Sequence, residues 1–169
     1  MKIAFVLYDG MTALDFMGVF DPLTRLKSMG FIPGMEWILC SNKNIIQDSN
    51  GIDYSSLEVC PTLSTYDWVI IPGGKGNRTL LKDENFLSWL RTISQDQKVA
   101  AVCTGSLLLA ATGLLTGKKA TTHPAAYEEL REMGVQVSQD RIVVDRNVIT
   151  SGGVTSGIDL GLWLCKQIA

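Results

Sequence analysis

The sequence predicts an α/β fold in which helices cover both faces of a mostly parallel central sheet. Two observations support this prediction. Short apolar runs rich in β-branched residues alternate along the chain with longer segments that have helical hydrophobic spacing. Loops that carry glycines or reactive side chains directly follow several of the apolar runs. In an open parallel sheet such loops meet at one edge, which is where a ligand is expected to bind.

The composition is typical of one domain that acts on a small molecule. With 169 residues the chain can bury a sizeable core, and we expect residues 1–169 to form a single domain. Its formal net charge of −2 argues against a partner among nucleic acids or anionic membranes. The apolar opening is interrupted at Asp9, and no run approaches the length of a membrane span. We therefore expect a cytoplasmic protein.

The four cysteines show neither CxxC nor Cys/His metal-ligand spacing. They are Cys40, Cys60, Cys103 and Cys165. This distribution argues against a disulfide framework and against a zinc site, so we expect reduced thiols and no bound metal.

Residues 98–111 are predicted to form a buried strand, a tight turn and a helix. The apolar run 98–102 changes abruptly at Cys103-Thr104-Gly105-Ser106, and a Leu/Ala segment follows without a helix breaker. Cys103 then lies beside the first amides of the helix, where the positive end of the helix dipole favours a thiolate. Hydrolases with a G-x-S-x-G motif present serine in the same way. The pattern indicates a nucleophile elbow, and the alternative is a free cysteine that fills the core.

The rest of the chain is predicted to contain further strands and helices that alternate, as a mostly parallel sheet requires. Strands are predicted at residues 1–8, 35–41, 67–71, 118–122, 135–137, 142–144 and 148–150, and helices at 11–29, 77–96, 125–133 and 158–168. The segment 42–63 is polar and irregular, with a short hairpin about Asn50-Gly51. Pro22 is expected to kink or restart its helix.

Asp15 lies at the start of the helix that follows the first strand. Its position alone favours a simple interaction with the helix N-terminus, where carboxylates are common. The alternative is a proton-transfer group at the carboxyl edge of the sheet.

Two glycine-rich loops also follow predicted strands. Pro72-Gly73-Gly74-Lys75-Gly76 lacks the GK[ST] ending of a phosphate-binding loop, but its amides could approach a ligand and stabilise developing negative charge. Gly152-Gly153-Val154 follows the last strand. A tight turn is the alternative for both loops.

His123 is the only histidine of the chain and precedes Pro124. A catalytic pair with Cys103 is one interpretation. We favour the other, in which a lone histidine before a proline is a turn residue.

Six motifs, taken in order over nearly the whole chain, resemble the ThiJ/PfpI superfamily. They are Ala13-Leu14-Asp15-Phe16 with Gly18, Ile70-Ile71-Pro72-Gly73-Gly74, Val102-Cys103-Thr104-Gly105-Ser106-Leu107, Gly113-Leu114-Leu115 with Gly117-Lys118, Ala120-Thr121-Thr122-His123, and Ser151-Gly152-Gly153-Val154-Thr155-Ser156-Gly157-Ile158-Asp159. The resemblance implies a flavodoxin-like three-layer sandwich with a nucleophile elbow. Within the superfamily the chain is most similar to the isocyanide (isonitrile) hydratases, because Asp15 and Thr104 stand where many relatives carry Glu and His.

The resemblance implies a hydro-lyase that converts a small isocyanide to an N-substituted formamide through a thioimidate. Cys103 would attack the isocyanide carbon, Asp15 would protonate that carbon and then activate water, and the Thr104 hydroxyl would orient Asp15 or the water. Substrate contacts are expected at Gly73, Gly74, Gly152, Gly153 and Val154. The scheme needs no metal or organic cofactor, and the resemblance further implies a homodimer.

Two other functions remain open. The sensor domains of AraC-type regulators share the Cys-Thr-Gly and Thr-Thr-His motifs, and a reactive thiol in a pocket is a target of peroxide, so a non-catalytic or redox-responsive sensor module is one alternative. A glyoxalase- or amidase-like enzyme that uses Cys103 with His123 is the other.

Pro124 departs from the hydratase pattern, which has an aromatic residue there, and the hydratases continue into further C-terminal helix.

Overall fold

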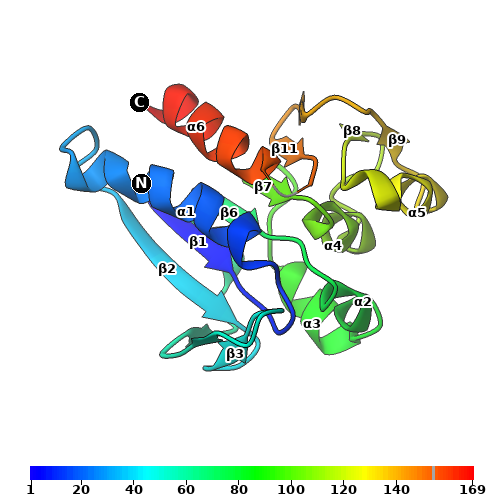
Figure 1. Ribbon diagram of the computed structural model, residues 1–169, viewed down its shortest axis with the longest axis horizontal. Coiled ribbons are helices and arrows are strands. Elements are labelled where there is room, and N and C mark those ends of the chain that lie inside the picture. Colours follow the sequence, from blue (N-terminus) through cyan, green and yellow to red (C-terminus); the bar gives the residue numbers. More distant parts are fainter. Residues whose placement is uncertain (154) are drawn as a thin grey trace.

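A seven-stranded sheet, parallel except at one edge, forms the centre of the molecule (Figure 1). Its strands in spatial order are Ile142–Asp145 (β10), Val148–Ser151 (β11), Lys98–Val102 (β7), Trp68–Ile71 (β6), Lys2–Val6 (β1), Glu36–Ser41 (β2) and Glu58–Val59 (β5). β10 pairs antiparallel with β11, and the other neighbours pair in parallel. This computed structural model describes residues 1–153 and 155–169, so the predicted substrate contact at Val154 lies outside the described residues.

Two groups of helices cover the sheet. Ala13–Ser28 (α1) and Ser156–Ile168 (α6) pack side by side on one face, and Asn77–Leu80 (α2), Glu84–Leu90 (α3), Gly105–Thr112 (α4) and Tyr127–Glu132 (α5) gather on the other (Figure 1). The central strands β6 and β11 are buried at every residue, as expected for strands covered on both faces. The predicted α/β class with a mostly parallel sheet is therefore confirmed.

Several local predictions are refined by the structure. The hairpin about Asn50-Gly51 is present, and it joins Ile46–Gln47 (β3) to Asp53–Tyr54 (β4). α1 continues through Pro22 to Ser28 as one helix. Within the predicted strand 118–122, Lys119–Ala120 form a strand (β8). It pairs with Gln136–Val137 (β9) outside the main sheet. Two 3₁₀ turns, at Leu63–Thr65 (η1) and Pro124–Ala126 (η2), complete the elements.

The order of the strands creates a crevice at one edge of the sheet. From β1 the chain crosses to β2 on one side, whereas from β6 it crosses to β7 on the other. The strand order therefore reverses between β1 and β6, and ligands of such sheets bind beyond the carboxyl ends of the strands at this switch point. Asp15 follows β1, Gly73 follows β6 and Cys103 follows β7. The fold thus brings three of the predicted site residues to the crevice.

None of the helices within residues 1–153 and 155–169 is long and apolar enough to cross a bilayer.

Candidate active site

Cys103 stands in the turn between β7 and α4 with a strained backbone. Its φ is 55°, in the left-handed region that residues with a side chain seldom adopt and that often marks functional sites. The Cys103 amide donates a hydrogen bond to the Ser151 carbonyl, and its carbonyl accepts from the hydroxyls of Ser106 and Thr122. These three contacts fix the backbone of the elbow and hold the thiol in a defined place.

Gly73 is the point at which Asp15, Cys103 and Thr104 meet. A Cβ built on Gly73 would lie 2.9 Å from Oδ2 of Asp15 and 2.8 Å from Cβ of Cys103. It would also lie 2.7 Å from the amide nitrogen of Thr104. A residue with a side chain does not fit there without displacing its neighbours. The carboxyl of Asp15 and the side chain of Cys103 are therefore packed over the same glycine.

The Asp15 carboxyl is buried and does not cap its helix. The residue is 1% exposed, and neither carboxyl oxygen accepts a hydrogen bond of standard geometry from the described residues. Burial raises the pKa of Asp15 to about 6, and the Gly73 amide and the Cys103 thiol lie close enough to limit that rise. A buried carboxyl with free acceptor capacity and a pKa near 6 is suited to exchange a proton with a ligand.

The Thr104 hydroxyl binds the loop after β6. Its Oγ1 accepts a hydrogen bond of 3.0 Å from the Gly74 amide. The Gly74 amide therefore already has an acceptor within the protein, and its contact with a substrate stays a prediction. The hydroxyl keeps its own proton and can donate it to a further acceptor.

A cavity of about 290 Å³ opens above these residues. Its lining includes four of the predicted site residues, and in full it consists of Thr12, Asp15, Gly74, Lys75, Arg78, Cys103, Thr104, His123, Ala125 and Ala126. The volume is suited to a small molecule. Cys103 and Asp15, which are both buried, therefore border the same cavity.

Two glycines, Gly152 and Gly153, directly follow β11. A Cβ on Gly153 would lie 2.4 Å from Cδ2 of His123, so this glycine leaves space for the imidazole ring. The Gly152 amide donates to the Arg141 carbonyl. Neither glycine is among the described residues that line the cavity, and direct substrate contact at these two positions stays a prediction.

His123 has the predicted role of a turn residue. Its Nδ1 accepts a hydrogen bond of 3.0 Å from the Ala125 amide and so caps η2. Because Nδ1 acts as an acceptor within the turn, it is not the nitrogen that would take a proton from Cys103.

The structure adds three residues that the sequence did not reveal. Lys75 and Arg78 line the cavity beside Cys103. Tyr8, at the end of the first strand's apolar run, is buried and donates a hydrogen bond of 2.6 Å to the Pro72 carbonyl. Burial first, and then the nearby acidic groups of Asp15 and Cys103, raise the pKa of Tyr8 well above its ordinary value. The only sequence signal for Tyr8 was a polar group at the end of an aliphatic run.

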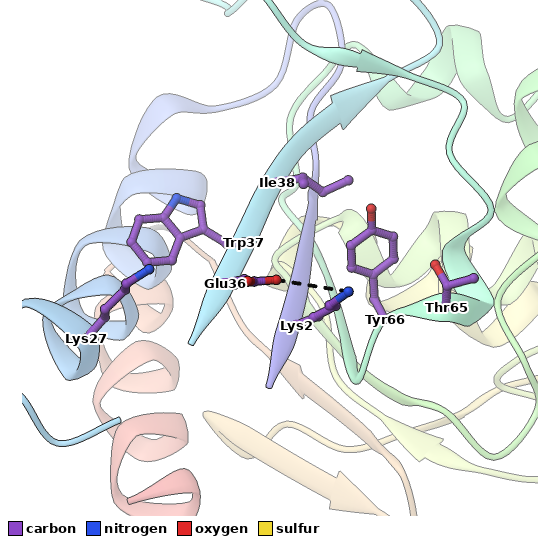
Figure 2. A pocket seen from close by; sticks show the side chains of 7 residues that line it. All are labelled: Lys2, Lys27, Glu36, Trp37, Ile38, Thr65 and Tyr66. Carbon is purple, nitrogen blue, oxygen red and sulfur yellow. Dashed lines mark ion pairs between the residues drawn. The ribbon is translucent and has the colours of Figure 1, made fainter. Parts of the chain in front are cut away.

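A second cavity, of about 480 Å³, lies at the start of β1 and β2, at the opposite end of these strands from Cys103 (Figure 2). Figure 2 shows Lys2 facing Glu36, with Tyr66 and Thr65 nearby and Lys27 beside the Trp37 ring. This cavity contains neither a cysteine nor a buried carboxyl. The larger volume therefore does not make it the better candidate for chemistry. Within the described part of the chain, no group of three or more His, Cys, Asp or Glu side chains could hold a metal ion.

Comparison with known proteins places this site in a family. The model of the DJ-1/PfpI family matches residues 1–167. This chain belongs to the DJ-1/PfpI family. The sequence is 36% identical to isonitrile hydratase of Pseudomonas putida over 99% of the chain and 72% of that protein. It is 31% identical to protein DJ-1alpha of Drosophila melanogaster, over 96% of the chain and 75% of that protein.

A member of a different functional class is also similar. The HTH-type transcriptional regulator CdhR of Pseudomonas aeruginosa is 29% identical over 96% of the chain, which covers 49% of the regulator. Among solved structures, a ThiJ/PfpI family protein from Pseudomonas syringae superposes with a TM-score of 0.85 at 29% identity, over 98% of the chain and 68% of that protein. Schizosaccharomyces pombe DJ-1, at 22% identity, has a TM-score of 0.83 over 100% of the chain and 92% of that protein, which supports the shared fold. The DJ-1/PfpI fold predicted from the motifs is thereby confirmed.

Proposed function

We propose that this member of the DJ-1/PfpI family hydrates a small isocyanide to an N-substituted formamide, with Cys103 as the nucleophile and Asp15 as the proton-transfer group. The observation that carries the proposal is the packing of the Asp15 carboxyl and the Cys103 side chain over Gly73, at the floor of one small cavity. The similarity to isonitrile hydratase of Pseudomonas putida supports the choice of substrate.

The first step forms a thioimidate. The Cys103 sulfur bonds to the terminal carbon of R–N≡C while the thiol proton passes to Asp15. As the sulfur adds, that carbon gains electron density, and Asp15 delivers the proton to it, giving R–N=CH–S–Cys103. Because Asp15 has a pKa of about 6, it can both accept and release this proton near neutral pH.

The second step consumes one water. Asp15, again a carboxylate, takes a proton from water as the oxygen adds to the thioimidate carbon, and it passes this proton to the nitrogen. The C–S bond then breaks, the sulfur recovers its proton, and R–NH–CHO leaves. One water is added over the cycle, and Cys103 and Asp15 return to their starting states.

Turnover of a simple alkyl isocyanide tests this proposal. We expect the protein to convert cyclohexyl isocyanide to N-cyclohexylformamide, and we expect the rate to fall at least about 1,000-fold in Cys103→Ala and about 100-fold or more in Asp15→Asn. Cys60→Ala is the matched control, because Cys60 is an exposed cysteine outside the cavity. Equal turnover in all four proteins would exclude the proposed roles.

A redox-responsive sensor is the second candidate, favoured by the similarity to the regulator CdhR. In that case Cys103 would be oxidised to a sulfenic acid, and no isocyanide would be turned over. Absence of the formamide product together with rapid, selective oxidation of Cys103 by dilute peroxide would favour the sensor over the hydratase.

We also propose a homodimer, supported by an apolar surface on the paired helices α1 and α6. It consists of four exposed apolar side chains, Leu14, Met17, Ile158 and Leu162. A Cβ on Gly18 would contact the Ile158 side chain at 3.2 Å, so the two helices are adjacent there. Exposed apolar side chains gathered on two adjacent helices favour protein association.

A further inference from the structure

Two basic side chains line the cavity above Cys103 in a chain whose net charge is −2. Two of its lining residues, Lys75 and Arg78, are cations at the pH of the cell. Asp15 is the one acidic residue of the lining, and it lies at the floor with the thiol. A ligand in this cavity therefore lies near two basic side chains as well as the thiol.

Arg78 is held in place by one contact within its own helix, α2, and one to α5. Its Nη1 donates 2.8 Å to Oδ1 of Asn77, and its Nη2 pairs with Glu129 of α5 at 3.0 Å. Asn77 is itself fully buried and donates 2.7 Å to the Thr104 carbonyl in the nucleophile elbow. The guanidinium is thus positioned relative to the elbow by a buried amide rather than left free on the surface.

Arg78 and Lys75 have capacity for a further anion. A guanidinium has five N–H donors in a planar fork that matches a carboxylate. Within the described residues, Lys75 has no ion-pair partner. The lining also includes the small side chains of Ala125 and Ala126, which leave room for a compact substituent.

We propose that the substrate carries an anionic group, a carboxylate on the carbon chain that bears the isocyanide, and that Arg78 and Lys75 bind this group while the isocyanide carbon faces Cys103. This inference extends the proposed function by specifying the substrate class. Arg78 and Lys75 are then specificity residues, and the small volume of the cavity limits the chain between the two groups to a few carbons.

Alkylation of Cys103 tests anion recognition without requiring turnover. Iodoacetate and iodoacetamide have nearly the same size and differ in charge. The rate with iodoacetate divided by the rate with iodoacetamide at one thiol is therefore independent of the intrinsic reactivity of that thiol. We expect this ratio, measured for each cysteine by peptide mass spectrometry, to be at least about tenfold higher at Cys103 than at the exposed Cys60. It should fall towards the Cys60 value in Arg78→Gln and in high salt.

Lys82→Gln is the matched control. It removes the same charge from an exposed side chain that does not line this cavity, so the ratio at Cys103 should stay as in the unaltered protein. A ratio at Cys103 equal to or below that at Cys60, or one that Arg78→Gln does not lower, overturns the proposal.

Turnover provides the second arm. 3-Isocyanopropanoate should have a kcat/KM at least about tenfold above that of the neutral propyl isocyanide, and Arg78→Gln should abolish the difference. Failure of the two hypotheses can be distinguished. Turnover of both isocyanides at equal rates overturns the anionic substrate and leaves the hydratase in place. Selective alkylation by iodoacetate without turnover of either isocyanide contradicts the hydratase and supports the anion site.

Discussion

The carboxyl of Asp15 and the side chain of Cys103 approach the backbone of Gly73 from two directions, to 2.9 and 2.8 Å from the place where a Cβ would stand. The two residues are 88 positions apart in the chain and follow different strands, β1 and β7. Their meeting depends on Gly73, which lies in the loop after the intervening strand β6 and has no side chain to separate them.

Gly73→Ala is therefore expected to impair the site. The added methyl group would push either the Asp15 carboxyl or the elbow out of place, because it would also lie 2.7 Å from the Thr104 amide nitrogen. A displacement of about 1 Å can cost about 100-fold in rate, and we expect a loss of that order in kcat for isocyanide hydration. Gly34→Ala is the control, since a Cβ there would have no heavy atom within 4 Å. Full activity of Gly73→Ala would show that the close packing is irrelevant to function.

Asp15→Asn is expected to stabilise the fold at neutral and alkaline pH while it removes activity. The folded-state pKa of about 6 lies above the ordinary pKa of 3.8 for an aspartate, so the folded protein disfavours the ionised form. The resulting penalty is absent below pH 3.8 and develops fully as the pH rises past 6, where it reaches up to about 3 kcal/mol. Urea denaturation at pH 4.5 and pH 8 measures it. Asp15→Asn should gain stability relative to the unaltered protein at pH 8 and much less at pH 4.5, and the reverse order would contradict the raised pKa.

Thr104 offers a test of the contact between the elbow and the loop after β6. Thr104→Val removes the acceptor of the Gly74 amide and leaves that buried donor unpaired, which costs about 1–3 kcal/mol. Thr104→Ser keeps the hydroxyl. Thermal unfolding should show a lower Tm for Thr104→Val than for Thr104→Ser, and hydration activity should follow the same order. Equal behaviour of both variants would mean that the 3.0 Å contact contributes nothing.

The apolar surface on α1 and α6 can be tested through the oligomeric state. Leu162→Glu places a charge on a surface that would be buried in a dimer, and we expect a monomer by light scattering. Val144→Glu, at an exposed position on β10, should leave the mass of the assembly unchanged. A dimer that survives Leu162→Glu would have to use another surface.

Much of the fold could be predicted from local sequence patterns. The apolar run before Cys103 and the Leu/Ala segment after it specify a strand, a turn and a helix within 14 residues, and the structure contains all three. β5 was missed because two exposed residues carry no hydrophobic pattern. Pro22 was expected to disturb α1, but the helix continues through it to Ser28.

The site was less accessible to sequence reasoning, because its decisive features arise between distant segments. A carboxylate at a helix start is consistent with capping and with catalysis, and only the burial of Asp15 against Gly73 distinguishes the two. The bond between Thr104 and Gly74 joins residues 30 positions apart. The buried Asn77 accepts a hydrogen bond from Arg78 and donates one to the Thr104 carbonyl. No local pattern indicates the pairing of Asn77 with Thr104.

Mass spectrometry of the protein during turnover tests the roles of Cys103 and Asp15 most directly. Mixing with excess cyclohexyl isocyanide followed by rapid acid quenching should reveal a covalent adduct on the Cys103 peptide whose added mass equals that of one isocyanide, and this adduct should decay as N-cyclohexylformamide appears. In Asp15→Asn both the formation and the decay should be slowed. Formamide that accumulates without any adduct on Cys103, or at an undiminished rate in Cys103→Ala, would contradict the mechanism.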